Sequence, residues 1–289
     1  MKTAIINGKI ITPHRILDQA SLVMEDGVIA GIVRGRKPEA DCCIDAEGAY
    51  VSPGFIDIHT HGGGGHDFMD GTPDAIIKAC MAHLAHGTTS ICPTTLTCTD
   101  EELLTFFDCY REARKQMENG PELLGIHMEG PYFSLEQRGA QDPQYIKVPA
   151  RDDYKKLLDA SDDIIRMSAA PELEGAMELA DELKARGILA SIGHSDATYD
   201  HVIEAWERGY THVTHLYSGM STIRRINAYR HLGVIESAYL IDGMTVEIIA
   251  DGKHLPPELL RFIVKMKPIE DICLVTDSMR GAGMDDGEH

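Results

Sequence analysis

The sequence predicts an α/β protein, a (β/α)8 TIM-type barrel preceded by a small β-rich unit. Segments that fit strands begin near residues 54, 88, 124, 164, 188, 212, 245 and 272, at spacings of 24 to 40 residues. Most of the intervening segments have helical periodicity, as in 101–117, 175–186 and 257–267. Strands that alternate with helices favour a parallel sheet, closed as a barrel or open and doubly wound. The spacing alone does not exclude the open sheet.

The first 52 residues predict a separate β unit. Residues 4–11, 21–24 and 28–33 alternate or run apolar, and Asp26-Gly27 is a good hairpin turn. We therefore divide the chain into a small β unit, residues 1–52, and a barrel, residues 53–289. In the barrel, Thr72-Pro73 predicts the start of the first helix, and Gly87 its end.

Composition restricts the function. The formal net charge of −19 argues against nucleic-acid binding, and an anionic substrate would need a local group of cations or donors. The seven cysteines are scattered and form no Cys-x-x-Cys, which suits reduced thiols in the cytoplasm. The N-terminal residues contain no long apolar run, so neither a signal peptide nor a membrane span is expected.

The segment from Gly54 to Phe68 predicts half of a metal site. It begins as a buried strand and ends in four consecutive glycines, which allow a substrate to approach closely. His59 and His61 lie two residues apart, so both imidazoles leave the same face of a strand. Imidazole is a good ligand for zinc or iron. The alternative is a pair of histidines that merely line the pore.

Polar residues follow five later strands, where a purely structural core would not need them. Because catalytic groups of a barrel gather where strands end, these residues are expected to meet His59 and His61. Their histidine nitrogens and carboxylate oxygens suit Zn²⁺ or Fe²⁺. The five segments are His127-Met-Glu129, Gly193-His194-Ser195, Thr214-His215-Leu-Tyr217, Asp251-Gly-Lys-His254 and Thr276-Asp277-Ser278.

These segments, with Pro53-Gly-Phe-Ile-Asp-Ile-His-Thr-His61, resemble the amidohydrolase superfamily and, within it, the N-acetylglucosamine-6-phosphate deacetylases. The resemblance extends over essentially the whole chain. It implies that a β-sandwich, made from both termini, flanks the barrel; only its N-terminal part is expected here. It also implies hydrolysis of the acetamide of N-acetylglucosamine 6-phosphate, by a metal-bound hydroxide, to glucosamine 6-phosphate and acetate.

The resemblance assigns roles by position. Glu129, His194 and His215 would hold one divalent metal ion, and His59 and His61 would help to hold a second, so one or two ions are expected. Asp277 would be the general base that later acts as the acid. Gln141 and His254 would bind the substrate. Zinc or iron is the expected metal.

Two motifs depart from the family. Ser218-Gly219 replaces the usual Asn-Ala, and Arg230-His-Leu-Gly233 replaces Arg-Glu-Pro-Gly. The resemblance associates these positions with the sugar phosphate, and it implies that the arginine is lent across a homodimer. Ser218, Gly219 and Arg230 are therefore expected substrate contacts.

Three function classes compete. The first is the deacetylase above; N-acetylgalactosamine 6-phosphate is an alternative substrate for it. The second is a cyclic-amide amidohydrolase, although such relatives often use a carboxylated lysine where Glu129 stands here. The third is a catalytically silent metal-binding relative, which would not need the proton shuttle that Asp277 provides.

Overall fold

The computed structural model describes residues 1–285 and 287, and these form two compact units, Met1–Phe55 and Ile56–His289. The first unit is a five-stranded sheet made of β1 (Lys2–Ile11), β2 (Ile16–Glu25), β3 (Val28–Arg34), β4 (Cys42–Asp45) and β5 (Tyr50–Val51). The expected hairpin turn joins β2 to β3. Asp26 and Gly27 have φ angles of 50° and 82°, as a two-residue turn with two left-handed residues requires.

β1 is the central strand of this unit. It pairs with β2 in antiparallel orientation, and with β4 and β5 in parallel orientation at different parts of its length. Ile10, Leu17 and Ala20 form a small buried cluster on the sheet. The described strands form a single sheet, so the β-sandwich stays a prediction.

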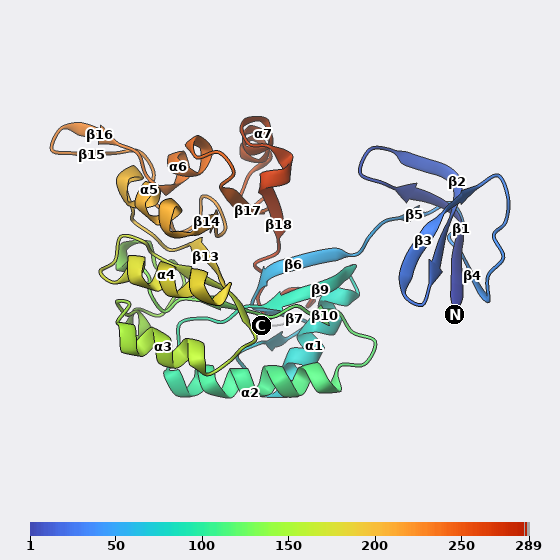
Figure 1. Cartoon of the computed structure of the whole chain (residues 1–289), viewed down its shortest axis with the longest axis horizontal. Coiled ribbons are helices and arrows are strands. Elements are labelled where there is room, and N and C mark those ends of the chain that lie inside the picture. The colour runs from blue at the N-terminus through green and yellow to red at the C-terminus, as the bar shows by residue number, and fades with distance from the viewer. Residues whose placement is uncertain (286, 288–289) are drawn as a thin grey trace. The chain divides into compact units, whose positions relative to one another are not determined.

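The second unit is a TIM-type barrel (Figure 1). All eight predicted ring strands are present, and each begins within about two residues of its predicted start. In ring order they are β6 (Phe55–Thr60), β9 (Thr88–Pro93), β11 (Ile126–Glu129), β12 (Ile164–Ala169), β13 (Leu189–Ile192), β14 (Tyr210–Val213), β17 (Thr245–Ile249) and β18 (Ile272–Val275).

Hydrogen bonds between the segments close the ring. β6 and β9 belong to one sheet, and another, with parallel pairing throughout, contains β11, β12, β13, β14, β17 and β18. A parallel bridge between Thr94 and His127 joins β9 to β11. The Asp277 N–H donates to the His59 carbonyl at 2.9 Å, which joins the end of β18 to β6. This closure rules out the open, doubly wound sheet.

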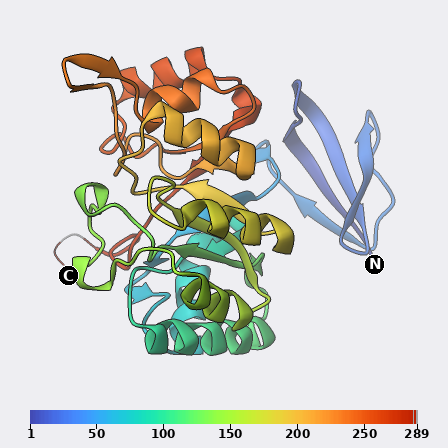
Figure 2. The same cartoon turned by 60° about the vertical axis from the view of Figure 1, so that its left-hand side comes forward.

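Helices follow the strands and lie outside them (Figure 2). Each of the first seven ring strands precedes one of them. They are α1 (Pro73–Leu84), α2 (Asp100–Gln116), α3 (Arg151–Asp159), α4 (Ala176–Arg186), α5 (Tyr199–Arg208), α6 (Val234–Leu240) and α7 (Pro257–Met266). None of the described helices combines the length and apolarity that crossing a membrane requires.

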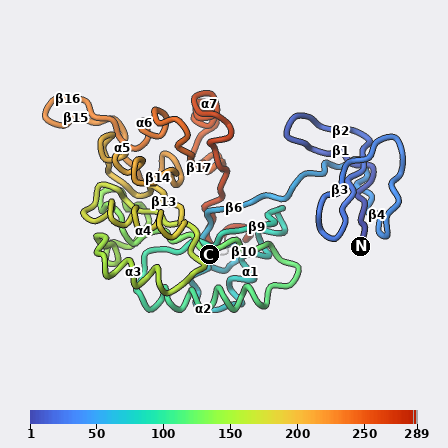
Figure 3. The backbone as a smooth tube through the Cα atoms, viewed as in Figure 1, coloured from blue at the N-terminus to red at the C-terminus, as the bar shows by residue number. Residues whose placement is uncertain are grey.

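Short elements complete the unit. Two of the hairpins are β7 (Gly62–Gly63) with β8 (His66–Asp67), and β15 (Arg224–Ile226) with β16 (Tyr229–His231). The second projects from the barrel unit (Figure 3). β10 (Glu122–Leu123) pairs with β9, and the 3-10 helices are η1 (Leu135–Gln137), η2 (Pro143–Tyr145) and η3 (Ile269–Asp271).

Helix ends follow from local sequence. The Thr72 side chain accepts a hydrogen bond from the Ala75 N–H, and Pro73 opens α1, as expected. The end of this helix was predicted wrongly: α1 stops at Leu84, and Gly87, with φ of 96°, lies in the turn before β9. The left-handed glycine thus ends the turn rather than the helix.

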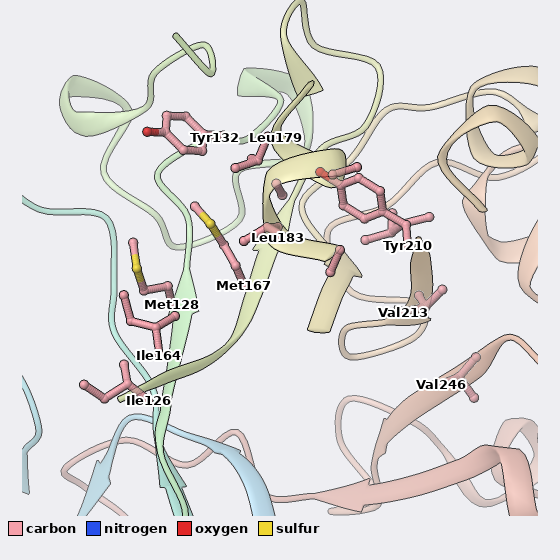
Figure 4. Packing of buried hydrophobic residues seen from close by; sticks show 14 of the residues in the cluster. Ile126, Met128, Tyr132, Ile164, Met167, Leu179, Leu183, Tyr210, Val213 and Val246 are labelled. Carbon is pink, nitrogen blue, oxygen red and sulfur yellow. The ribbon is translucent and has the colours of Figure 1, made fainter. Parts of the chain in front are cut away.

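The two faces of the ring strands differ in chemistry. Toward the helices, the strands present apolar side chains such as Met128 and Met167, which pack near Leu179 and Leu183 of α4 (Figure 4). Toward the interior, polar side chains contact one another across the ring. Arg166 of β12, for example, pairs with Glu247 of β17, although β13 and β14 lie between them. The interior therefore suits polar chemistry rather than a second apolar core.

Thr99→Ala should destabilise the barrel unit. Thr99 forms a complete capping box with Glu102 at the start of α2, and its loss leaves backbone N–H groups unsatisfied. We expect a loss of about 1 kcal/mol, or roughly 2–4 °C in the midpoint of thermal unfolding for a unit of this size.

Thr105→Ala is the matched control in the same helix. The Thr105 hydroxyl bonds only the Glu101 carbonyl within α2, and alanine is the better helix former. An equal loss in both variants, measured by circular dichroism on heating, would contradict a specific role for the capping box.

Candidate metal centre

The ends of the ring strands bring histidines and carboxylates together. His59 lies near the end of β6 and His61 directly after it, while Glu129 is the last residue of β11. His194 and His215 follow β13 and β14. Two groups of three residues have ligand atoms that all lie within 4.8 Å of one another, and both contain Glu129. One is His59, His61 and Glu129; the other is Glu129, His194 and His215.

Glu129 is the residue common to both groups. Its Oε1 lies 3.3 Å from His59 Nε2, 3.3 Å from His194 Nε2 and 3.1 Å from His215 Nε2. Its other oxygen, Oε2, lies 3.3 Å from His61 Nε2. A single buried carboxylate thus faces four imidazole nitrogens.

The other ring nitrogen fixes the tautomer of three of these histidines. Nδ1 of His59 lies 3.0 Å from a Glu247 oxygen, that of His61 lies 3.3 Å from the Thr94 carbonyl, and that of His194 lies 2.9 Å from the Gln137 carbonyl. These acceptors cannot donate, so each Nδ1 carries the hydrogen. In the neutral rings, each Nε2 then directs a lone pair toward Glu129.

That arrangement fits a bound cation. His59 Nε2 is buried without a hydrogen-bond partner in the described part of the chain. His194 Nε2 and His215 Nε2 lie 3.2 Å apart, a separation at which a proton or a cation has to lie between the two nitrogens. Histidine nitrogens and carboxylate oxygens are ligands that zinc and iron accept.

Asp277 borders the histidine cluster and is the most exposed of its carboxylates, at 18%. Its Oδ1 lies 3.2 Å from His61 Nε2 and 3.5 Å from His59 Nε2. Burial alone would raise its pKa, but the hydrogen bond with His61 and the charge of His59 lower that pKa below its ordinary value. Asp277 is therefore ionised at neutral pH, as a base must be.

Electrostatics in the metal-free centre favour bound protons. Burial disfavours a charged His61, but hydrogen bonds with Asp277 and Glu129 raise its pKa to about 9. Burial likewise opposes ionisation of Glu129, yet the surrounding histidines keep its pKa well below its ordinary value. A cation that enters the centre would replace these protons.

The backbone at the centre is strained. His194, His215 and Asp277 have φ angles of 48°, 30° and 48°, in the left-handed region that side chains other than glycine rarely adopt. Such strain costs of order 1–3 kcal/mol per residue and is concentrated at functional sites.

Comparison with known proteins identifies the family. A sequence profile of the amidohydrolase family matches residues 50–284. This chain belongs to the amidohydrolase family. It is similar to the N-acetylglucosamine-6-phosphate deacetylase of Lysinibacillus sphaericus, at 32% identity over 94% of this chain and 70% of that protein.

Two other relatives are informative. The N-acetylgalactosamine-6-phosphate deacetylase of Escherichia coli O157:H7 is 32% identical over 97% of this chain and 72% of its own length. A solved structure of a mutant N-acetyl-D-glucosamine-6-phosphate deacetylase from Mycobacterium smegmatis contains N-acetyl-D-glucosamine-6-phosphate. It is 31% identical, with a TM-score of 0.88 over 99% of this chain and 73% of that one.

The expected substrate residues of this amidohydrolase are dispersed. Gln141 is buried against the centre: its amide nitrogen donates to Glu129 at 2.9 Å, and its amide oxygen accepts from the Thr97 N–H. Gly219 lies against His194, since a Cβ built there would be 2.8 Å from His194 Nδ1. Ser218 is part of the same turn, where its N–H bonds the His215 carbonyl.

His254 and Arg230 are farther out. The His254 side chain is half exposed and bonds Asp251 at 2.9 Å. Arg230 is exposed on β16, opposite Arg225 of β15. Among the described residues, no hydrogen bond or ion pair joins either side chain to the histidine cluster.

Sequence reasoning missed the residues behind the ligands. Glu247 and Arg166 are isolated charges within largely apolar strand segments, and this pattern is the signal in the sequence that could have revealed them. His127, in the predicted polar segment His127-Met-Glu129, is also buried behind the cluster. Its ring nitrogens bond Ser168 and Thr94, and its ring contacts that of His59 edge-on at 4.7 Å. It therefore packs against His59 rather than against Glu129.

Metal loading should reveal up to two ions per chain. His59 and His61 form with Glu129 a group of possible ligands separate from that of His194 and His215, and a carboxylate can bridge two cations. Combining His59→Asn with His61→Gln should leave one ion, measured by elemental analysis after gentle loading.

His86→Gln is the control, because His86 is an exposed histidine on the turn after α1. A native protein that never exceeds one ion, and that the double replacement leaves unchanged, would mean that the pair only hydrogen-bonds in a one-metal pocket.

Proposed function

We propose that this amidohydrolase hydrolyses the acetamide of N-acetylglucosamine 6-phosphate, giving glucosamine 6-phosphate and acetate. The observation that carries the proposal is the pair of three-residue groups that share Glu129, with Asp277 at 3.2 Å from His61. The names of relatives at about 32% identity over most of the chain support the substrate.

We assign Glu129, His194 and His215 to one divalent metal ion, and His59 and His61, with Glu129, to a second. The tautomers fixed by Glu247, Thr94 and Gln137 support this assignment. Zinc or iron is the proposed metal, since both accept imidazole and carboxylate ligands. When bound, such an ion makes water more acidic and polarises the amide carbonyl.

Asp277 supplies the proton transfers. As an ionised carboxylate at the rim of the cluster, it takes a proton from the attacking water and then delivers it to the leaving amine. Its contacts with His59 and His61 orient its Oδ1 toward the centre. The amine product leaves after protonation, because a neutral amine is a far better leaving group than an amide anion.

Substrate recognition is assigned to Gln141, Ser218, Gly219, Arg230 and His254. Gln141 lies against Glu129, and Gly219 lies against His194, so both are next to the ligand groups. Arg230 is the proposed phosphate contact, because guanidinium offers two parallel donors to an anion. We propose that it acts across a homodimer, which its position on a projecting hairpin supports.

The remaining assignments concern the whole chain. We propose a division into a small β unit, residues 1–52, and the amidohydrolase barrel, residues 53–289. In the proposed β-sandwich, the sheet of the first unit is one layer. All seven cysteines are free thiols, which supports a reducing, cytoplasmic location.

The direct test is acetate release by metal-loaded protein. N-acetylglucosamine 6-phosphate should be the best substrate, ahead of N-acetylgalactosamine 6-phosphate and of a hydantoin, a cyclic amide. Preference for the galactosamine compound would favour the second candidate, which the Escherichia coli relative supports. Turnover of the hydantoin alone would overturn both.

Asp277→Asn should keep the metal but reduce turnover by about 10²–10⁴-fold, because the amide cannot move the proton. Metal content and acetate release should be measured on the same sample. Asp242→Asn, at an exposed position before β17, is the control. An active Asp277→Asn variant would remove Asp277 from the mechanism.

Arg230→Ala should weaken binding of N-acetylglucosamine 6-phosphate far more than binding of unphosphorylated N-acetylglucosamine. The charge-assisted contact with phosphate would be lost, whereas the sugar ring would keep its contacts. Calorimetry with both ligands measures the difference.

Arg225→Ala is the matched control, because Arg225 is the neighbouring cation on the same hairpin. An equal effect of Arg225→Ala would indicate a diffuse attraction by the hairpin. Equal losses of affinity for both sugars in Arg230→Ala would indicate that Arg230 does not contact the phosphate and is only a solvated residue of the hairpin.

A further inference from the structure

A fully buried carboxylate lies behind the histidine cluster and takes no part in the proposed proton transfers. Glu247 is the third residue of β17, and its side chain is 0% exposed. Moving an ionised carboxylate out of water is costly unless a cation and hydrogen bonds compensate. The contacts of Glu247 therefore indicate which groups it holds in position.

Each oxygen of Glu247 has a different task. Oε1 pairs with the Arg166 guanidinium and lies 3.4 Å from His212 Nε2. Oε2 lies 3.0 Å from His59 Nδ1 and also accepts the backbone N–H of His215 at 2.9 Å. One oxygen atom thus contacts one residue from each of the two ligand groups.

Arg166 is itself held in place from several strands. Its guanidinium donates to the Ile58 carbonyl of β6, to the Ser191 hydroxyl of β13 and to the Thr214 hydroxyl after β14. These bonds fix the cation that neutralises Glu247, so the carboxylate has little freedom to turn. Burial alone would raise the pKa of Glu247, but Arg166 keeps it well below its ordinary value.

The two contacts of Oε2 act on different parts of the two histidines. At His59, an acceptor on Nδ1 forces the hydrogen onto that nitrogen and leaves Nε2 with a lone pair facing Glu129. At His215, the bond holds a backbone N–H whose residue has a φ of 30° and is therefore strained. Glu247 thus acts on the ring of one ligand and on the backbone of another.

We propose that Glu247, fixed by Arg166, is a positioning residue that sets the tautomer of His59 and the backbone of His215, and so aligns both metal-ligand groups. The inference rests on the proposed function for its biological purpose. The competing explanation is an ion pair that only fills the barrel interior. Carboxylates that orient a ligating histidine typically contribute 10–100-fold to metal affinity.

The first experiment compares Glu247→Gln with Glu236→Gln, using Zn²⁺ alone in competition with a chelator. Arg166 and the His215 N–H donate to different oxygens of Glu247, whereas a glutamine side chain offers only one acceptor oxygen. Its NH2 group would therefore face a donor, and we expect about 10–100-fold weaker zinc binding. Glu236→Gln makes the same change at a carboxylate that bonds Thr222 and the Gly233 N–H and touches no ligand, so its zinc affinity should stay close to that of the unmodified protein. Equal losses in the two variants would overturn the proposal.

A second variant keeps the test decisive if Glu247→Gln fails to fold. Combining Glu247→Leu with Arg166→Met removes both charges, which buried ion pairs often tolerate. In the ¹⁵N-labelled, metal-free protein at alkaline pH, the His59 ring should shift from the Nδ1–H tautomer toward Nε2–H, and zinc binding should weaken. The His59 signal is assigned by its loss in His59→Asn. An unchanged tautomer with unchanged zinc affinity would overturn the proposal.

Failure of the proposed function would look different. If the unmodified protein binds zinc, shows this variant pattern and releases no acetate, the deacetylase proposal fails and the role of Glu247 stands. If the protein releases acetate but Glu247→Gln binds zinc normally, the role of Glu247 fails and the deacetylase proposal stands.

Discussion

The Glu129 carboxylate is the interaction on which the centre depends. Four imidazole nitrogens from the ends of three ring strands approach its two oxygens within 3.1–3.3 Å. Because the carboxylate is acceptor-only, it tolerates this crowding when protons or cations lie between the groups. Gln141 bonds one of its oxygens and limits its rotation. The orientation of Glu129 therefore sets the geometry available to every neighbouring ligand.

A polar barrel interior makes that arrangement possible. The Thr214 hydroxyl bonds those of Ser168 and Ser191 at 2.7 and 2.6 Å, which links β12, β13 and the end of β14. Such groups are costly to bury singly but are stable as a satisfied network. The apolar residues that fold the barrel lie instead between the strands and the helices. Stability and chemistry thus occupy opposite faces of the same strands.

The sequence predicted the ring strands and the clustered histidines because both follow from local rules. Alternation places His59 and His61 on one face, and parallel strands end at one rim. It did not predict the pairing of Glu247 with Arg166, since an isolated charge in an apolar segment does not reveal a partner 81 residues away. Nor did it predict that Gln141 bonds Glu129, because its position depends on a loop. Gly87 misled the prediction of a helix end, since a left-handed glycine also suits a turn.

Closure of the ring has a consequence for the order of assembly. The last ring strand docks on the first through contacts such as that of Thr60 with Ser278, which are 218 residues apart in the chain. Contacts of such long range are formed late, because the loop entropy must be overcome first. His61 and Asp277 meet across this same seam. During synthesis, the earlier strands can pair as they emerge, but Asp277, the proposed proton carrier, joins the histidines only after almost the whole barrel has been made.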